Sequence, residues 1–69
     1  MKVFLTGASG VMGRSTMNSL VGAGHDVVGL ARSDRAASVV EAHGGRPHRG
    51  TVFDVDALAE GMRGCDVVI

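Results

Sequence analysis

The feature that most constrains the fold is a glycine-rich segment near the start of the chain, Thr6–Gly13, with the sequence TGASGVMG. It follows an apolar run, Val3–Leu5, that is typical of a buried strand, and it precedes a segment with helical periodicity. Glycines spaced G-x-x-G-x-x-G at such a junction permit a sharp turn, a close approach of a ligand to the backbone, and tight packing of the helix on the strand. The N–H groups and the positive dipole end of the helix would face an anion there. The segment therefore predicts a binding site for a diphosphate.

Two other interpretations apply to this segment. The first is a tight turn between strand and helix that binds nothing, because glycine-rich turns are common. The second is the phosphate-binding P-loop, suggested by the sequence Gly13-Arg14-Ser15. That motif requires four residues between its first glycine and a Gly-Lys-Ser/Thr sequence, whereas five separate Gly7 from Gly13 and Arg14 replaces the lysine. The P-loop is therefore excluded.

Hydrophobic periodicity and capping residues divide the chain into alternating strands and helices with no linker between them. We expect strands over residues 2–6, 26–31, 46–52 and 66–69, and helices over residues 11–23, 34–43 and 55–63. Ser33 and Asp54 are the expected N-caps of the second and third helices. Glycines at positions 24, 44 and 64, evenly spaced along the chain, are expected to end the three helices.

Apolar strands separated by helices indicate a parallel sheet that is covered on both faces. Right-handed crossovers then give the strand order 3-2-1-4, and Pro47 confines the third strand to an edge or to a late start. The fold class is therefore α/β, with a Rossmann-type doubly wound parallel sheet. In the third helix, the apolar residues expected to face the sheet are Val55, Leu58, Ala59 and Met62.

The predicted strand order also bears on domain organisation. The fourth strand would lie in the middle of a complete sheet, yet here it would leave an apolar edge open. We therefore expect residues 1–69 to be the N-terminal portion of a dinucleotide-binding domain, with the remainder of that domain and a substrate domain absent. The alternative is a short chain that is marginally stable or forms an oligomer through that edge.

Charge and composition argue against several classes of partner. Seven basic and seven acidic residues give no net charge, and without a basic stripe nucleic acid is not an expected partner. No apolar run approaches the roughly 20 residues of a membrane span, and the N-terminal run is too short for a signal peptide. The single Cys65 excludes an internal disulfide and fits a reducing compartment, so a cytoplasmic protein is expected. The histidines lack metal-ligand spacing, so no metal is expected.

The end of the second strand bears on the choice between NAD and NADP. In sites for NAD, an acidic residue about 20 residues beyond the glycines binds the ribose hydroxyls. Here Ala31 stands at the expected position of that carboxylate, and Arg32 follows it. A guanidinium would bind a 2′-phosphate bidentately, and Ser33 adds a hydroxyl donor, so the sequence favours NADP over NAD. Arg35 would add positive potential, whereas Asp34 could pair with either arginine and weaken the preference. The alternative is a solvated Arg32 with no ligand.

Three segments together resemble the short-chain dehydrogenase/reductase superfamily: TGASGVMG at 6–13, VVGLAR at 27–32 and GCDVVI at 64–69. The resemblance is closest to the extended branch, the NAD(P)-dependent epimerase/dehydratase family, and nearly as close to the atypical branch. It implies that the backbone N–H groups of Val11 and Met12 contact the pyrophosphate, with Gly7 and Gly10 beneath it. Ser9 would donate to the diphosphate or cap the helix.

The resemblance also implies an adenine contact after the third strand, where family members usually carry an Asp followed by an aliphatic residue. Thr51 stands at the Asp position and Val52 at the aliphatic one. Thr51 can accept a hydrogen bond but lacks the charge, so this contact departs from the family pattern. Asp54 is better interpreted as a helix cap than as a ligand contact.

The chemistry of the family relies on a Tyr-x-x-x-Lys pair and a Ser or Thr, all far downstream. This chain has no tyrosine and a single lysine, Lys2, so no catalytic residue is assigned. The resemblance implies an NADP-dependent oxidoreductase, epimerase or dehydratase that acts on a carbonyl or hydroxyl carbon of a small molecule such as a nucleotide-sugar. The alternatives are a non-catalytic NADP-sensing regulator of the atypical branch and an inactive fragment.

Overall fold

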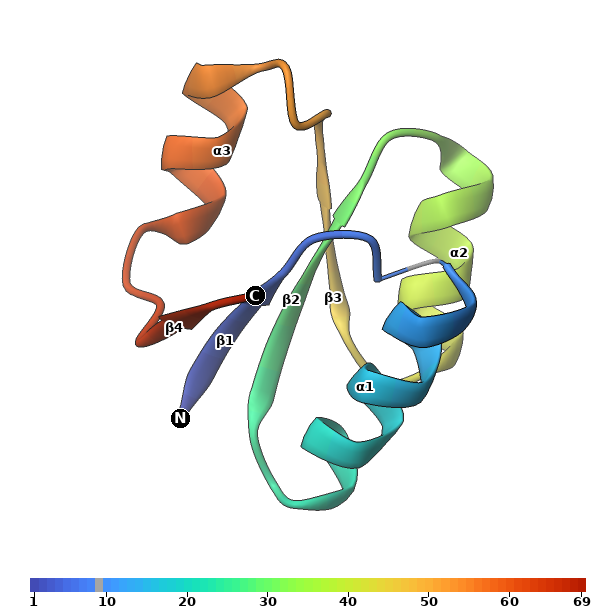
Figure 1. Ribbon diagram of the computed structural model, residues 1–69. Coiled ribbons are helices and arrows are strands. Elements are labelled where there is room, and N and C mark those ends of the chain that lie inside the picture. The colour runs from blue at the N-terminus through green and yellow to red at the C-terminus, as the bar shows by residue number, and fades with distance from the viewer. Residues whose placement is uncertain (9) are drawn as a thin grey trace.

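The computed structural model describes residues 1–8 and 10–69, which form a four-stranded sheet and three helices (Figure 1). Strands and helices alternate along the chain as the periodicity predicts. In order they are β1 (Lys2–Leu5), α1 (Val11–Gly22), β2 (Asp26–Ala31), α2 (Asp34–Ala42), β3 (Arg46–Arg49), α3 (Val55–Met62) and β4 (Val67–Val68).

The strands are parallel and lie in the order β3-β2-β1-β4, which confirms the order predicted from right-handed crossovers. In the centre, Phe4 of β1 lies opposite Val28 of β2 and Val68 of β4. Pro47 lies in the edge strand β3, opposite Gly29. Because the strands are parallel, their carboxyl ends meet at one edge of the sheet, the upper edge in Figure 1.

Each face of the sheet carries its own hydrophobic cluster, because successive side chains of a strand point to opposite faces. The cluster under α1 and α2 joins buried residues of β1, β2, the turn after β1 and both helices: Leu5, Ala8, Met17, Val27 and Val40. The cluster under α3 joins buried strand residues to half-buried residues of the helix: Phe4, Val28, Leu30, Leu58 and Met62. Figure 1 shows the same division, with α1 and α2 on one side of the sheet and α3 on the other.

Strand β3 ends at Arg49 rather than at residue 52, because the backbone beyond it forms local hydrogen bonds. The N–H of Gly50 still donates to the carbonyl of Ala31 at 3.0 Å. After that, the N–H of Asp54 donates to the carbonyl of Thr51 at 3.1 Å, and the N–H of Phe53 donates to the Thr51 hydroxyl at 3.2 Å. A turn over residues 51–54 therefore replaces the end of the predicted strand.

The predicted apolar face of α3 is only half right. Leu58 and Met62 pack against the Phe4 cluster, but Val55 is 74% exposed and Ala59 also faces solvent. The buried Gly61 lies close against the sheet, where an added Cβ would lie 2.5 Å from the Phe4 ring. The helix is therefore rotated toward a glycine that a count of apolar residues overlooks.

The helix ends follow the sequence signals. The hydroxyl of Ser33 accepts from the N–H of Ala36 at 3.1 Å, and the carboxylate of Asp54 accepts from the N–H of Ala57 at the same distance. The three predicted helix-ending glycines, at positions 24, 44 and 64, all have positive φ. Among residues 1–8 and 10–69, no helix is long and apolar enough to cross a membrane.

The last glycine of the motif fixes how closely α1 approaches the turn after β1. A Cβ built on Gly13 would lie 1.9 Å from the carbonyl oxygen of Gly7 and 2.9 Å from the Cα of Ala8. Both neighbours are backbone atoms, so they cannot move aside as a flexible side chain would. Only a residue without a side chain allows this contact.

Replacing Gly13 by alanine is expected to lower the free energy of unfolding by about 1–3 kcal/mol, because the added methyl overlaps the Gly7 backbone. Denaturation by urea, followed by far-ultraviolet circular dichroism, measures the change. The matched control is Gly22→Ala in the same helix, where the added Cβ meets no atom within 4 Å. It should be neutral or stabilising by up to about 1 kcal/mol. Equal destabilisation by both substitutions would contradict the packing role of Gly13.

Candidate dinucleotide-binding site

A cavity of about 380 Å³ opens at the carboxyl ends of the strands. It is lined by five residues that the sequence analysis assigned to a cofactor: Gly7, Gly10, Arg32, Thr51 and Val52. They come from three separate loops, after β1, after β2 and after β3. The parallel strand order brings these loops to one edge, which is where nucleotides bind in open α/β sheets.

The turn after β1 has the form needed to bind an anion. Gly7 has φ +66°, a left-handed conformation that favours glycine, and its carbonyl accepts from the N–H of Gly10 at 3.0 Å. Gly10 is then the N-cap of α1, and it has no side chain to accept from the first-turn N–H groups. Among the described residues, no hydrogen bond engages the N–H groups of Val11 and Met12. These donors, at the positive end of the helix dipole, suit a phosphate.

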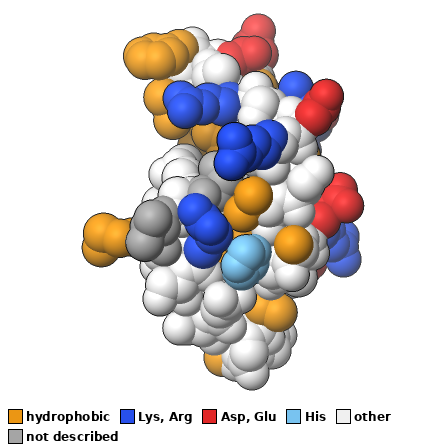
Figure 2. All heavy atoms as spheres, turned by 90° about the vertical axis from the view of Figure 1, so that its right-hand side faces the viewer, with side chains coloured by type: hydrophobic (Ala, Val, Ile, Leu, Met, Phe, Trp, Pro, Cys, Tyr) orange, Lys and Arg blue, Asp and Glu red, His pale blue; other side chains and the backbone are white. Residues whose placement is uncertain are grey.

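A second cavity, of about 300 Å³, lies between the first turns of α1 and α2. It is lined by three arginines, a serine and two apolar residues: Arg14, Arg32, Arg35, Ser33, Ala36 and Val39. Arg32 lines both cavities, so the two hollows share one wall. Figure 2 shows basic side chains gathered on the upper part of the face that carries α1 and α2. This cavity can bind an anionic group of a ligand that also occupies the first.

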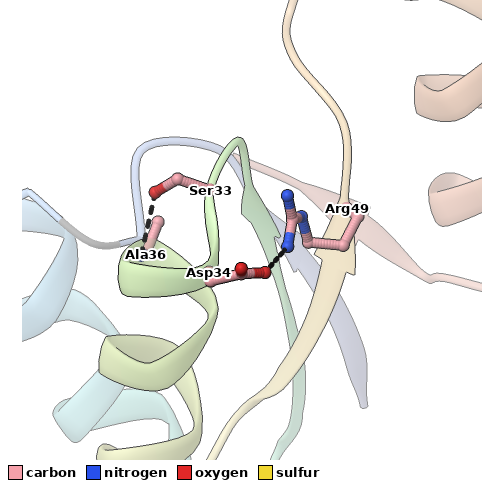
Figure 3. A network of polar contacts seen from close by, with 4 residues as sticks. All are labelled: Ser33, Asp34, Ala36 and Arg49. Atoms are coloured by element: carbon pink, nitrogen blue, oxygen red, sulfur yellow. Dashed lines mark hydrogen bonds and ion pairs between the residues drawn. The ribbon is translucent and has the colours of Figure 1, made fainter.

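Among the described residues, the ion pairs do not involve the arginines of this second cavity. Between described residues they join Asp26 to Arg46, Asp34 to Arg49, and Glu60 to Arg63, so none involves an arginine of the cavity. Figure 3 shows the Asp34 carboxylate directed toward Arg49 of the neighbouring strand β3. The sequence left open a pairing of Asp34 with Arg32 or Arg35, whereas in the structure its partner is Arg49. Among the described residues, no carboxylate forms an ion pair with Arg14, Arg32 or Arg35.

The other predicted site residues either line neither cavity or lie outside the described residues. Met12 is 84% exposed and lines neither cavity, so only its backbone N–H can serve the site. Val11 likewise contributes the first backbone N–H of α1. Gly13 acts through packing against Gly7. Ser9 lies outside the described residues.

Sequence reasoning missed three residues that line the first cavity: Leu30, Gly50 and Phe53. Gly50 and Phe53 are adjacent in sequence to Thr51 and Val52, and Leu30 lies two positions before Arg32. Phe53 is 91% exposed beside the hollow, although it is one of only two aromatic residues in the chain. That rarity, together with its place next to Val52, was the available signal.

The parallel strand order, with helices on both faces of the sheet, is that of a Rossmann-type fold. Residues 7–69 match the model of the NAD(P)H-binding family, and the chain belongs to that family. This match confirms the resemblance to the nucleotide-binding part of the short-chain dehydrogenases and reductases. It also assigns a nicotinamide dinucleotide as the class of cofactor.

Several curated proteins resemble the chain over nearly its whole length. It is 46% identical over 69 residues to an uncharacterized protein of Schizosaccharomyces pombe, covering 100% of this chain and 23% of that one. It is 46% identical over 68 residues to the 4-hydroxy-2-methyl-3-oxo-4-farnesyl-3,4-dihydroquinoline-1-oxide ketoreductase of Stigmatella aurantiaca, covering 99% and 20%. It is 37% identical to the decarboxylating sterol-4-alpha-carboxylate 3-dehydrogenase of Dictyostelium discoideum, covering 97% and 20%. The chain thus spans less than a quarter of the length of these relatives.

Solved structures show the same fold. The anaerobillin reductase ChuY from Escherichia coli O157:H7 superposes with a TM-score of 0.83 at 24% identity, covering 99% of this chain and 35% of that one. A candidate NAD-dependent epimerase/dehydratase from Bacillus halodurans gives a TM-score of 0.81 at 22% identity, covering 99% and 31%. At these identities the likeness extends to the fold alone.

The cap of α2 at the edge of the second cavity yields a stability prediction. Ser33→Ala removes the acceptor of the Ala36 N–H, so the free energy of unfolding is expected to fall by about 1 kcal/mol. Urea denaturation followed by circular dichroism measures the change. The control is Ser38→Ala, at an exposed position within the same helix, which should leave stability unchanged or slightly raised. Equal losses in the two variants would show that the Ser33 cap contributes nothing.

Proposed function

We propose that residues 1–69 form the cofactor-binding N-terminal portion of an NADP-dependent oxidoreductase, epimerase or dehydratase of the extended short-chain type. The observation that carries the preference for NADP is the arginine-lined cavity joined to the nucleotide cavity through Arg32. The small residue Ala31, which is buried at the end of β2, leaves no carboxylate to bind the ribose hydroxyls or to repel a 2′-phosphate.

The glycine turn is the proposed site of the pyrophosphate. The backbone N–H groups of Val11 and Met12 bind its oxygens, while Gly7 and Gly10 leave room for it above the turn. The sequence motif assigns Ser9 as a further hydroxyl donor to the pyrophosphate. Gly13 contributes by holding the helix close to the strand.

The loop after β3 is the proposed adenine site. Val52 and Phe53 offer exposed apolar surface to the base at the wall of the first cavity. The Thr51 hydroxyl accepts from the N–H of Phe53, so its own proton remains to be donated to a ring nitrogen. The second lone pair of the hydroxyl can also accept a hydrogen bond from the adenine, although without the charge of the family's aspartate.

The NADP preference rests on charge. A 2′-phosphate carries close to two negative charges at neutral pH, and Arg32 offers a planar fork of N–H donors that matches it. The Ser33 hydroxyl accepts from the N–H of Ala36 and can donate its proton to a phosphate oxygen at the same time. In NAD the same arginine would face uncharged hydroxyls, which leaves a cation without its partner.

When bound, the nicotinamide accepts or donates a hydride at a carbonyl or hydroxyl carbon of a small-molecule substrate. The ketoreductase and sterol dehydrogenase names of the relatives support a reaction of this class. Residues 1–69 contain no tyrosine and one lysine, so no catalytic acid or base is assigned among them. Their proposed role is to hold and orient the cofactor. The second candidate is a non-catalytic NADP-sensing protein, and the composition of residues 1–69 favours neither candidate because the family's Tyr-x-x-x-Lys pair lies far downstream. The cytoplasm is the proposed location, because a single unpaired cysteine, Cys65, fits a reducing compartment.

The substitution Arg32→Asp tests the cofactor preference. It is expected to weaken NADP binding about tenfold to a hundredfold more than NAD binding, because a charge-assisted pair becomes a repulsion. Calorimetric titration with each dinucleotide measures the ratio of dissociation constants. The control is Arg63→Asp, which makes the same charge change at the far end of α3 and touches neither cavity. If the ratio is the same in the native protein and in Arg32→Asp, NADP is the wrong assignment.

A further inference from the structure

We propose that His48 is a positioning residue, which holds the wall of the adenine site in place from outside the cavity. Its ring Nε2 donates to the carbonyl of Ala57 at 2.8 Å, and this bond joins the edge strand β3 to the first turn of α3. His48 lines neither cavity, so it can act on a ligand only through this bond. This inference rests on the proposed dinucleotide site and adds to it a residue that touches no part of the ligand.

The wall of the adenine site is a short exposed segment between β3 and α3. Residues 50–53 all line the first cavity, and the side chains of residues 51–54 are exposed. Figure 1 shows the segment at the upper edge of the sheet, where the chain passes from β3 to α3. Exposed side chains contribute little to fixing the place of a turn, so the position of this wall depends on how its two ends are held.

Both ends of the segment are held by one residue, Ala57. Before the turn, His48 donates to the Ala57 carbonyl, and a Cβ added to Gly50 would lie 2.8 Å from the Ala57 methyl. After the turn, the Asp54 carboxylate accepts from the Ala57 N–H at 3.1 Å. The Asp54 bond is a local helix cap, whereas the His48 bond ties the start of the helix to a strand. The His48 bond therefore determines where the capped turn lies relative to the sheet.

The imidazole ring of His48 is itself fixed by packing. It lies edge-on to the buried Phe4 ring, with the ring centroids 6.2 Å apart and the planes at 71°. A Cβ added to Gly61, one helical turn beyond Ala57, would lie 2.7 Å from Cδ2 of His48. Because a carbonyl oxygen only accepts, Nε2 carries the proton of this bond. A ring packed between a strand residue and a helix residue keeps its donor directed at Ala57.

The bond acts on affinity by keeping the wall in its binding position. Without the bond, the turn and the start of α3 would adopt further positions, and the apparent dissociation constant would rise as the binding-competent fraction falls. The net free energy of one hydrogen bond is enough to change that fraction about threefold to tenfold. The loss should be equal for NAD and NADP, because the two share the adenine and differ only at the 2′ position.

The test measures binding of NAD, NADP and adenosine 5′-monophosphate by calorimetry to the native protein, His48→Leu and His48→Gln. His48→Leu keeps an apolar side chain under α3 but removes the donor, and all three affinities should fall about threefold to tenfold. His48→Gln returns an N–H donor on a side chain of similar reach, so it should recover most of the loss.

His43→Leu is the matched control. His43 is half-buried like His48, and its Nδ1 is hydrogen-bonded to the carbonyl of Val39 at 2.8 Å, but it lies at the C-cap of α2 and lines neither cavity. Urea denaturation should show that His43→Leu and His48→Leu both lower the free energy of unfolding. Only His48→Leu should weaken binding by the folded protein, which a purely structural bond would not do.

A second measurement needs no variant. If the bond favours binding, binding must favour the bond to the same degree. Saturating the native protein with NAD should therefore slow the solvent exchange of the His48 Nε2 proton about threefold to tenfold, as followed by nuclear magnetic resonance. His48 lines neither cavity, so direct cover by the ligand does not account for such protection.

Unchanged affinities in His48→Leu would overturn the inference, and so would equal losses in His48→Leu and His48→Gln, because the hydrogen bond would then not be the cause. An exchange rate of the His48 Nε2 proton that is the same with and without NAD would also overturn it. Each of these results leaves the proposed function intact if Arg32→Asp still changes the ratio of NADP to NAD affinity. A native protein that binds neither dinucleotide would refute the proposed function itself.

Discussion

The contact between Gly13 and the backbone of Gly7 is the constraint on which the site depends. An added methyl at Gly13 would overlap the Gly7 carbonyl, so any other residue would push α1 away from the end of β1. The distance between the helix and the strand sets where the first N–H groups of α1 lie relative to the cavity. The packing of α1 on the strand and the position of its first N–H groups at the cavity thus depend on the same short glycine motif.

The parallel sheet turns this local motif into a site. Loops that follow β1, β2 and β3 are far apart in sequence, yet the order β3-β2-β1-β4 brings them to one edge. Each loop has a different task in the proposed complex: the first offers backbone donors, the second arginines, and the third apolar surface. None of the three forms a hollow alone, so the cavity is a property of the topology.

Local signals in the sequence predicted most of the fold. The caps at Ser33 and Asp54, the helix-ending glycines and the strand order all depend on single residues or on general crossover geometry, and the structure confirms them. The rotation of α3 onto Gly61 was not predictable in this way, because a glycine carries no hydrophobic signal. The ion-pair partner of Asp34 could not be predicted either, because Arg49 belongs to a strand that only the tertiary fold brings near Asp34. Sequence reasoning thus failed where the answer lay in contacts between elements.

The N-termini of the three helices differ in the side chains that cap them. Helices α2 and α3 each have a side-chain cap and an acidic residue in the first turn, which together satisfy the N–H groups and the dipole. Helix α1 begins at a glycine, has no acid in its first turn and carries Arg14 there instead. By the rules of helix stability this is the poorest of the three ends, yet it borders the cavities. In the proposed complex, the bound anion would supply the charge and the acceptors that the side chains of this helix end do not.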